Sequence, residues 1–455
     1  MEQDKRKSEV LGLRDSYLEM SLTPMKRLDP KIVNELQQLI LFASSTSPWW
    51  RKRLSHANFK ARTVQEVVSS LPVTSRVDLQ DFFEEMKIYI PNTDPNDYIL
   101  QKTTGSTGQP VQIVKYNPFY SRESDAITLL EWKWHQRDVR KKMGLFRLGS
   151  HDVDVIRAGP PLEYLGEVAP MFQRSSVDCT TEELLEAIFL HQPSYLLTNP
   201  LSLKLIAQAQ LSNPRRIAKI DQILTLADRV DESLRELAYQ AFGARIIDRY
   251  SSVEFGMIAL QCPKHNHLHV IVPNVHLEVV DENNLPVPKG EPGRVLITGL
   301  HNFAMPIIRY EQGDIVTMGE PCDTGISWPV IDSIQGRVRS VIDSATGERK
   351  LLTLFTADFL SMREIQDFRL VKFDDGAIFL AQTRDALSHD QEERIRSSLK
   401  QDVFREDLNI RILTQRQNLR APRWKVREIY IVSRSTHPHW AISDVEDLLE
   451  TADFE

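Results

Sequence analysis

A loop rich in glycine and hydroxyl side chains, Thr103-Thr-Gly-Ser-Thr-Gly-Gln-Pro110, has the composition of a phosphate-binding element. Glycines let backbone N–H groups approach a polyphosphate, and Ser and Thr hydroxyls add donors along it. Apolar and β-branched residues flank the loop from about 98 to 116, which predicts strand, loop, strand. Because no Gly-Lys-Ser/Thr follows and no helix is expected to begin there, the loop is not a Walker A element. On its own, this composition favours a plain hairpin turn.

Two later segments carry other groups that a nucleotide site needs. Asp248-Arg-Tyr-Ser-Ser-Val-Glu254 follows an expected strand, so that its aromatic ring could stack on a purine and its Glu could hold Mg²⁺. Arg309-Tyr-Glu-Gln-Gly-Asp314 pairs a cation with a loop carboxylate that could accept both hydroxyls of a ribose. Taken singly, the first is also explained as a strand end with a solvated Glu, and the second as a structural ion pair.

The elements that must position these groups alternate along the middle of the chain. Helical periodicity is expected at 181–190, 201–211 and 230–242, and short apolar strands at 194–198, 222–226 and 244–248. This alternation predicts a parallel α/β sheet. Residues 1 to about 60 are expected to be helical, and hairpin-like strands are expected at 269–272, 276–281 and 293–298. After Gly336-Arg337 the pattern predicts a strand at 368–373, a helix at 391–399 and a strand at 428–432.

Composition excludes several classes of protein. The net charge of −7 over 455 residues, with no basic stripe rich in aromatic residues, disfavours a nucleic-acid-binding protein. No apolar run reaches 18 residues, so no membrane span is expected. The first residues lack the apolar segment of a secretory signal, and three cysteines make no disulfide framework. We therefore expect a cytoplasmic protein without a nucleic-acid or membrane partner.

The order and spacing of the three segments resemble the adenylate-forming superfamily of acyl-CoA ligases, adenylation domains and luciferases. The most similar branch contains phenylacetate–CoA ligase and coenzyme F390 synthetase-like enzymes. Ala304-Met-Pro-Ile-Ile-Arg-Tyr-Glu-Gln-Gly-Asp314 nearly reproduces that branch's Ala-Met-Pro-Leu-Ile-Arg-Tyr-x-x-Gly-Asp block, and 103–110 and 250–254 match its phosphate loop and its Tyr-x-Ser-x-Glu element. Leu71-Pro-Val-Thr-Ser-Arg-Val-Asp-Leu79 and Gly336-Arg337 are weaker similarities.

This resemblance implies an α/β fold with two domains. The expectation is a large N-terminal adenylate-forming domain, residues 1–336, with mixed and partly parallel sheets that bind ATP and the acid. A small mobile α+β domain, residues 337–440, should act as its lid. Residues 441–455 form an acidic tail.

The resemblance also implies a role for each matched residue. Glu254 should ligate a Mg²⁺ ion that bridges the ATP phosphates, and Lys425 should stabilise the charge that develops during adenylation. The phosphate loop, the adenine-binding segment and the ribose contacts make up the remaining nucleotide site: Thr103, Thr104, Gly105, Ser106, Thr107 and Gly108; Asp248, Arg249, Tyr250, Ser251 and Ser252; Asp314 and Arg337.

Four positions depart from the pattern of the branch. Gln109 stands where many relatives place lysine, so backbone and hydroxyl donors must do more of the phosphate binding. Trp424 replaces the glycine before the catalytic lysine, and the alternative for Lys425 is one basic residue on a solvated face. Arg339 stands where the hinge usually has Asp or Lys, and Leu226-Ala-Asp228 keeps an acid but loses a glycine.

Clustered cysteine and histidine side chains suggest a zinc site. Cys262-Pro-Lys-His265-Asn-His267-Leu-His269 is followed about sixty residues later by Cys322-Asp-Thr-Gly325. Thiolate and imidazole are the ligands that tetrahedral Zn²⁺ prefers. In F390 synthetase-like relatives the later segment reads Cys-x-Cys-Gly; here its second cysteine is Thr324, so His265 or His267 would have to complete the ligand shell. Bound zinc would be structural, and the alternative is buried thiols beside surface histidines.

The function that follows from the resemblance is an ATP-dependent ligase. It would activate a carboxylic acid, aromatic or arylacetic, as acyl-AMP with release of pyrophosphate. It would then pass the acyl group to CoA, a carrier-protein thiol or an amine, in specialised-metabolite biosynthesis. A homodimer is one possible assembly. The alternative is a non-catalytic nucleotide-binding paralogue that acts as an interaction protein, which the altered hinge and Trp424 leave open although Glu254 and Asp314 are both present.

Overall fold

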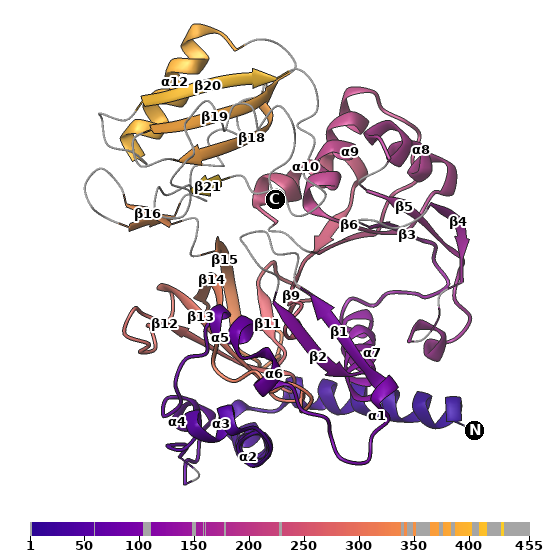
Figure 1. The fold of residues 1–455 in the computed structure, drawn as a ribbon. Helices are drawn as coiled ribbons and strands as arrows, with labels where there is room; N and C mark the ends of the chain where they lie inside the picture. The colour runs from indigo at the N-terminus through magenta and orange to yellow at the C-terminus, as the bar shows by residue number, and fades with distance from the viewer. Residues whose placement is uncertain are drawn as a thin grey trace. The chain divides into compact units, whose positions relative to one another are not determined.

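The computed structural model divides the chain into two compact units, one of residues 1–312 and 316–334 and the other of residues 313–315 and 335–455 (Figure 1). The residues that the structure describes are 2–58, 60–102, 111–147, 152–157, 159, 161–176, 179–226, 230–337, 341–343, 349–351, 365–372, 376–383, 387–402, 409–415 and 429–431.

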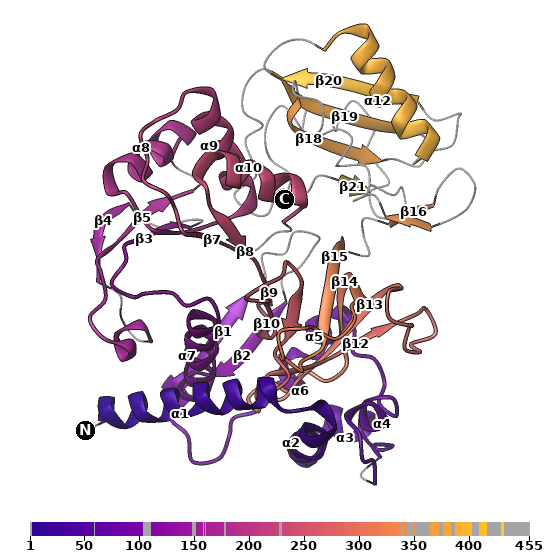
Figure 2. The same cartoon turned by 180° about the vertical axis from the view of Figure 1, so that it is seen from behind.

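A six-stranded sheet in the first unit has the order β4-β5-β3-β6-β7-β8. All neighbouring pairs run parallel except β4 and β5. Helices α8, α9 and α10 cover one face of this sheet, where Phe146, Leu196 and Ile223 are buried with them (Figures 1 and 2). The elements of this layer are β3 (Met143–Arg147), β4 (Val153–Ile156), β5 (Met171–Ser175), α8 (Thr181–His191), β6 (Tyr195–Thr198), α9 (Pro200–Ser212), β7 (Gln222–Thr225), α10 (Glu232–Phe242) and β8 (Arg245–Ile247).

A seven-stranded sheet follows, in the order β12-β13-β14-β15-β11-β10-β9. Its pairs β9–β10, β10–β11, β11–β15 and β12–β13 are antiparallel. The strands are β9 (Arg249–Ser252), β10 (Gly256–Gln261), β11 (Leu268–Val270), β12 (Val275–Val280), β13 (Pro292–Gly299), β14 (Tyr310–Met318) and β15 (Val330–Arg337). Because β8 and β9 are separated only by Asp248, the two sheets meet at that residue.

The antiparallel hairpin of β1 (Tyr98–Lys102) and β2 (Gln112–Tyr116) lies ahead of both sheets in the chain. β2 leads directly into α7 (Asn117–Trp134), and α1 (Glu2–Leu22) packs along α7 through ion pairs such as Arg6 with Asp125 (Figure 1). The remaining N-terminal elements are α2 (Met25–Thr46), α3 (Pro48–Arg53), α4 (Val64–Val68), α5 (Arg76–Asp81), α6 (Phe83–Met86) and the short 3-10 turns η1 (Pro95–Asp97) and η2 (Leu162–Leu165).

The second unit contains a four-stranded sheet of order β20-β19-β18-β21. Its central pair β18–β19 is antiparallel, and β20 and β21 join it in parallel on either side. A separate two-stranded sheet pairs β16 with β17. The elements are β16 (Val341–Asp343), β17 (Arg349–Leu351), β18 (Ile365–Lys372), β19 (Gly376–Thr383), α12 (His389–Asp402), β20 (Asn409–Gln415) and β21 (Ile429–Ile431).

The α/β class, with parallel and antiparallel sheets, is confirmed, and so are the alternating elements from 181 to 248. The two strands expected on either side of 103–110 are confirmed, since β1 and β2 pair with Lys102 opposite Gln112. One expectation is wrong: Asp314 lies inside strand β14 and not in a loop. Within the described residues, no helix is long and apolar enough to cross a membrane.

Candidate functional site

Several of the sequence-predicted groups lie outside the described residues. These are the whole Gly/Thr loop 103–110, together with Asp228, Arg339, Trp424, Lys425 and the tail 441–455. Arg337 ends strand β15, and only its backbone is described. The site is therefore built from the strands that flank the loop and from the Asp248 and Arg309 segments.

Lys115 on β2 connects the loop-bearing hairpin to the Glu254 segment. Lys115 lies two positions after the buried Ile113 on the same strand, so its side chain also points inward, and it is only 2% exposed. Its Nζ donates a hydrogen bond of 2.7 Å to the carbonyl of Val253 and lies 4.0 Å from the ring centre of Tyr120. Burial lowers the pKa of Lys115 to about 8, although the charge of Glu254 opposes this shift.

Glu254 sits in the turn that connects β9 to β10. The turn begins at Ser252, whose Oγ accepts a hydrogen bond from the backbone N–H of Phe255 at 3.3 Å. It ends at Gly256, which has a φ of +69°, a conformation that favours glycine. Glu254 is 6% exposed. A buried carboxylate next to a strand end is a suitable ligand for a hard cation such as Mg²⁺.

Asp248 is fixed at the carboxyl end of β8. Its carboxylate accepts hydrogen bonds of 2.9 Å from Thr225 Oγ1, at the end of β7, and of 2.8 Å from the N–H of Arg249. Its own N–H donates to Gln261 Oε1 at 2.8 Å. Ligands of open parallel sheets bind beyond the carboxyl ends of the strands, which is where Asp248 lies.

Arg249 is held by a buried ion-pair network. Its guanidinium forms two hydrogen bonds with the carboxylate of Glu131 on α7, and Arg137 lies 3.2 Å from the same carboxylate. Burial alone would raise the pKa of Glu131, but the two guanidinium groups outweigh it and hold that pKa well below its usual range. The side chain of Arg249 is thus engaged inside the protein, while Tyr250 beside it is 7% exposed and belongs to the core.

The Arg309 block is also anchored internally. The Arg309 guanidinium pairs with Glu278 at 3.2 Å and donates to the carbonyl of Leu71 at 2.7 Å. Thr74 adds two further bonds, because its N–H donates to the carbonyl of Arg309 and its Oγ1 to that of Ile308. Arg309 is therefore a structural cation, and Asp314, 8% exposed on β14, is the group of this block that remains a candidate for ribose binding.

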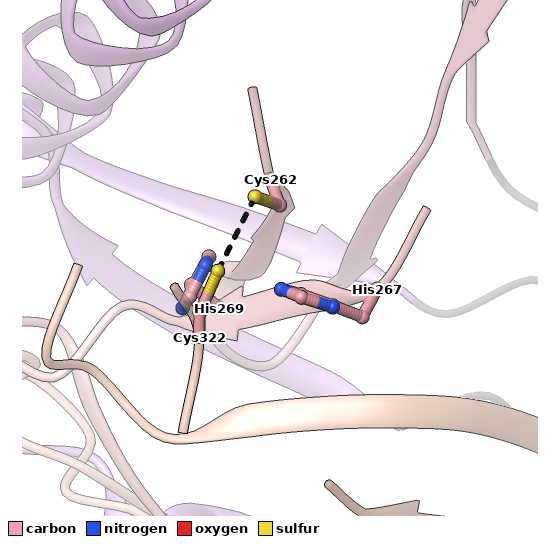
Figure 3. Close-up of side chains that lie close together, drawn as sticks. All are labelled: Cys262, His267, His269 and Cys322. Atoms are coloured by element: carbon pink, nitrogen blue, oxygen red, sulfur yellow. Dashed lines mark hydrogen bonds between the residues drawn. The ribbon is translucent and has the colours of Figure 1, made fainter. Parts of the chain in front are cut away.

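The predicted cysteine and histidine residues do come together (Figure 3). One ligand atom from each of Cys262, His267, His269 and Cys322 lies within 4.8 Å of the other three. The two Sγ atoms are 3.7 Å apart, far longer than a disulfide of about 2.05 Å. That distance matches the roughly 3.8 Å expected for two thiolates at ~2.3 Å from one tetrahedral Zn²⁺.

The histidine rings distinguish between the alternative fourth ligands. The Nε2 atoms of His267 and His269 are buried without a hydrogen-bond partner among the described residues, whereas His269 Nδ1 faces the carbonyl of Trp328 at 3.2 Å. His265 instead points its Nε2 at Asp323 Oδ1, 2.6 Å away. Buried ring nitrogens without partners suit a metal ion, so the donor set fits zinc with His267 in place of the missing cysteine.

This cluster is connected to the Asp248 segment. Gln261, which precedes Cys262, accepts the Asp248 N–H and also donates through Nε2 to the carbonyl of Ile246 at 3.2 Å. Arg245 on β8 donates to the carbonyls of Cys262, Pro263 and His265. The end of β10 is therefore fastened to β8 by side chains from both strands.

Comparison with solved structures identifies the fold, whereas comparison of sequences does not. No family model and no curated protein matches the sequence. Solved structures nevertheless show that the chain has the fold of the adenylate-forming CoA ligases, as the sequence resemblance implied.

Three of those structures indicate the extent of the likeness. 2-Hydroxyisobutyryl-CoA ligase in the postadenylation state, in complex with 2-HIB-AMP, has a TM-score of 0.70 at 14% identity, over 95% of this chain and 94% of that one. An anthranilate CoA ligase in complex with anthranoyl-AMP has a TM-score of 0.51 at 14% identity, over 72% and 66%. ATP-bound MatB from Rhodopseudomonas palustris has a TM-score of 0.51 at 13% identity, over 74% and 67%.

Proposed function

We propose that the protein is an ATP-dependent ligase that activates a carboxylic acid as acyl-AMP and releases pyrophosphate. The observation that carries this proposal is the position of Glu254. It is a buried carboxylate in a turn that Lys115 fastens to the strand following the Gly/Thr loop. An acid between adenine-binding and phosphate-binding segments is the group needed to hold a Mg²⁺ ion on the phosphates of ATP.

The other residues take the roles that the sequence resemblance implies for them. Thr103, Thr104, Gly105, Ser106, Thr107 and Gly108 bind the β- and γ-phosphates through backbone and hydroxyl donors. Tyr250, flanked by Ser251 and Ser252, borders the adenine with Asp248, and Asp314 and Arg337 bind the ribose. Arg249 is a positioning residue in this scheme, because its guanidinium is paired with Glu131. Lys425 stabilises charge on the carboxylate and the α-phosphate as the bond between them forms.

The acyl group then passes to a nucleophile that displaces AMP. Two of the similar structures are CoA ligases in complex with acyl-AMP ligands, which supports a thiol acceptor such as CoA over an amine. An aromatic or arylacetic acid is the class that we infer from the sequence branch. A carrier-protein thiol, a homodimeric assembly and a cytoplasmic role in specialised-metabolite biosynthesis are part of the same proposal.

Acid-dependent release of pyrophosphate tests the proposal. The protein is incubated with ATP, Mg²⁺ and a panel of aryl and aliphatic acids, and Glu254→Gln serves as the control that loses the metal-binding charge. We expect at least one acid to give turnover at least about a hundredfold above the variant. If every acid leaves the wild type at the level of Glu254→Gln, the protein is no ligase and the non-catalytic alternative gains support.

We further propose that Cys262, His267, His269 and Cys322 bind a structural Zn²⁺ ion. The ion would supply cross-linking between β10, β11 and the 322 segment, since the four ligand atoms already lie within reach of one centre. The second cluster around Cys322, with His265 and Asp323, shares only that thiol, and its histidine and carboxylate are engaged with each other.

Metal content measured on protein purified without a histidine tag checks this site. We expect about one equivalent of zinc in the wild type, and a strong loss in both Cys322→Ser and His267→Asn. His265→Asn is the matched control and should keep its zinc. Less than about a tenth of an equivalent in the wild type would contradict the site, and loss in His265→Asn with retention in His267→Asn would reverse the ligand assignment.

A further inference from the structure

Lys115 is a buried cation for which the sequence patterns provide no role. At 2% exposure it belongs to a residue type that is almost never fully buried without a partner. The cost of taking an ammonium group out of water is large, so its surroundings must compensate. Three groups offset part of this cost: the carbonyl of Val253, the ring of Tyr120 and the charge of Glu254.

The groups around Lys115 connect both strands of the hairpin to one turn. Tyr120, in the first turn of α7, has a raised pKa because it is buried, and the side chain of Gln101 on β1 opposes this shift. Its ring also lies against Gly256, where an added Cβ would be 3.5 Å from the ring and the hydroxyl. Lys115 on β2 contacts the same ring through its Nζ atom and donates a hydrogen bond to the carbonyl of Val253. We call Gln101, Lys115, Tyr120 and the Val253 carbonyl the Lys115 clasp.

The clasp joins the two parts of the site that must act on the same phosphates. β1 and β2 are the strands on either side of the Gly/Thr loop, and Val253 is the residue before Glu254. The partners are 138 positions apart in the sequence, so the bond between them sets a tertiary distance and not a local turn. A charged donor at 2.7 Å is among the stronger hydrogen bonds of a protein.

We infer that Lys115 is a positioning residue for Mg²⁺·ATP: it fixes the Glu254 turn against the hairpin that carries the phosphate loop. This inference rests on the proposed function, because it gives Glu254 the role of metal ligand. Lys115 also carries a positive charge on the strand that follows the loop, in which Gln109 stands in place of lysine. Its action is indirect, through the position of the Glu254 carboxylate and through the local potential.

Calorimetric titration of nucleotides into the full chain tests the inference. Lys115→Met removes both charge and donor, Lys115→Gln keeps a donor without the charge, and Lys133→Met removes an exposed lysine of the same unit as the control. We expect the Kd for Mg²⁺·ATP to rise about tenfold in Lys115→Met and about threefold in Lys115→Gln, and to stay unchanged in Lys133→Met. The Kd for AMP without Mg²⁺ should stay unchanged in all three, because AMP lacks the bridging metal ion.

The AMP titration distinguishes positioning from general loss of structure. If Lys115→Met weakens the binding of AMP as much as the binding of Mg²⁺·ATP, Lys115 is merely structural and the inference is wrong. If both Lys115 variants bind Mg²⁺·ATP as the wild type does, the inference is wrong while the proposed function stands. If the wild type itself does not bind Mg²⁺·ATP, both fail. If Lys115→Met does not fold, the same comparison of the Kd for Mg²⁺·ATP with the Kd for AMP is made with Lys115→Gln.

Discussion

Arg309 illustrates how a residue in the most characteristic sequence block can be purely structural. Its φ of +49° is a left-handed conformation that few side chains adopt, and the surrounding hydrogen bonds hold it there. Its guanidinium is shared between Glu278 and backbone carbonyls, including that of Asn284 at 3.2 Å. Arg309 does form a structural ion pair, but with Glu278 and not with the Asp314 carboxylate of its own segment.

Removing the counter-charge of Arg309 should destabilise the first unit. Glu278→Gln leaves a buried guanidinium without its carboxylate, and we expect the free energy of unfolding to fall by about 3 kcal/mol. Chemical denaturation followed by far-UV circular dichroism measures it. Glu311→Gln, which breaks the more exposed pair with Arg294, is the control and should cost less than about 1 kcal/mol. If the two variants lose the same free energy of unfolding, the buried pair stabilises the protein no more than the exposed pair does, which contradicts the prediction.

Residue types in the sequence were sufficient to propose part of the candidate site. Asp248 and Glu254 could be named because an acid after a strand end is recognisable locally. Lys115 and Glu131 could not, since their partners Val253 and Arg249 are 138 and 118 positions away. The one available signal was that Lys115 lies two positions after the buried Ile113 on the same strand, so that both side chains point to the same face.

At the scale of elements, periodicity identified the helices that have one apolar face and clear ends. The helix expected at 181–190 is α8, where Thr180 and Glu183 form a capping box at its start. No element was expected between 117 and 180, where the structure has α7, β3, β4 and β5. The first half of α7 is polar, and β4 is exposed along most of its length, so neither shows the apolar pattern on which such predictions rest.

Packing between β3 and β5 leaves no room for a side chain at Gly144. An added Cβ would lie 2.6 Å from Cζ of Phe172 and 3.2 Å from a methyl group of Leu196. We therefore expect Gly144→Ala to lower the free energy of unfolding by about 1–3 kcal/mol, because it overpacks the core. The measurement is again denaturant unfolding of the whole chain.

A second substitution at Phe172 separates overpacking from a backbone effect. In the Gly144→Ala background, Phe172→Leu should be less harmful than it is in the wild type, since it removes the ring that the new methyl group meets. Strictly additive losses would show that the two residues do not press on each other. Contact with the Phe172 ring would then not be the reason for glycine at position 144.

At the scale of the whole molecule, structural similarity supports the fold, and individual side chains support the proposed function. The fold is that of the adenylate-forming CoA ligases, over 95% of the chain. At 14% identity that likeness settles no chemistry, and the proposed function rests on Glu254, Asp248 and Asp314 in their strands and turns. The two-unit division could be expected from the Gly336-Arg337 pair only through resemblance, because composition does not change abruptly there.

The central claim is that a carboxylate attacks the α-phosphate of ATP, and an isotope-transfer measurement tests it most directly. An acid that supports turnover is labelled with ¹⁸O in both carboxylate oxygens, and hydroxylamine serves as the acceptor. If acyl-AMP forms, displacement at the carbonyl carbon leaves one ¹⁸O atom on the released AMP, while pyrophosphate stays unlabelled. Mass spectrometry should find that AMP. Label in inorganic phosphate together with ADP would instead show attack at the γ-phosphate and would contradict the account.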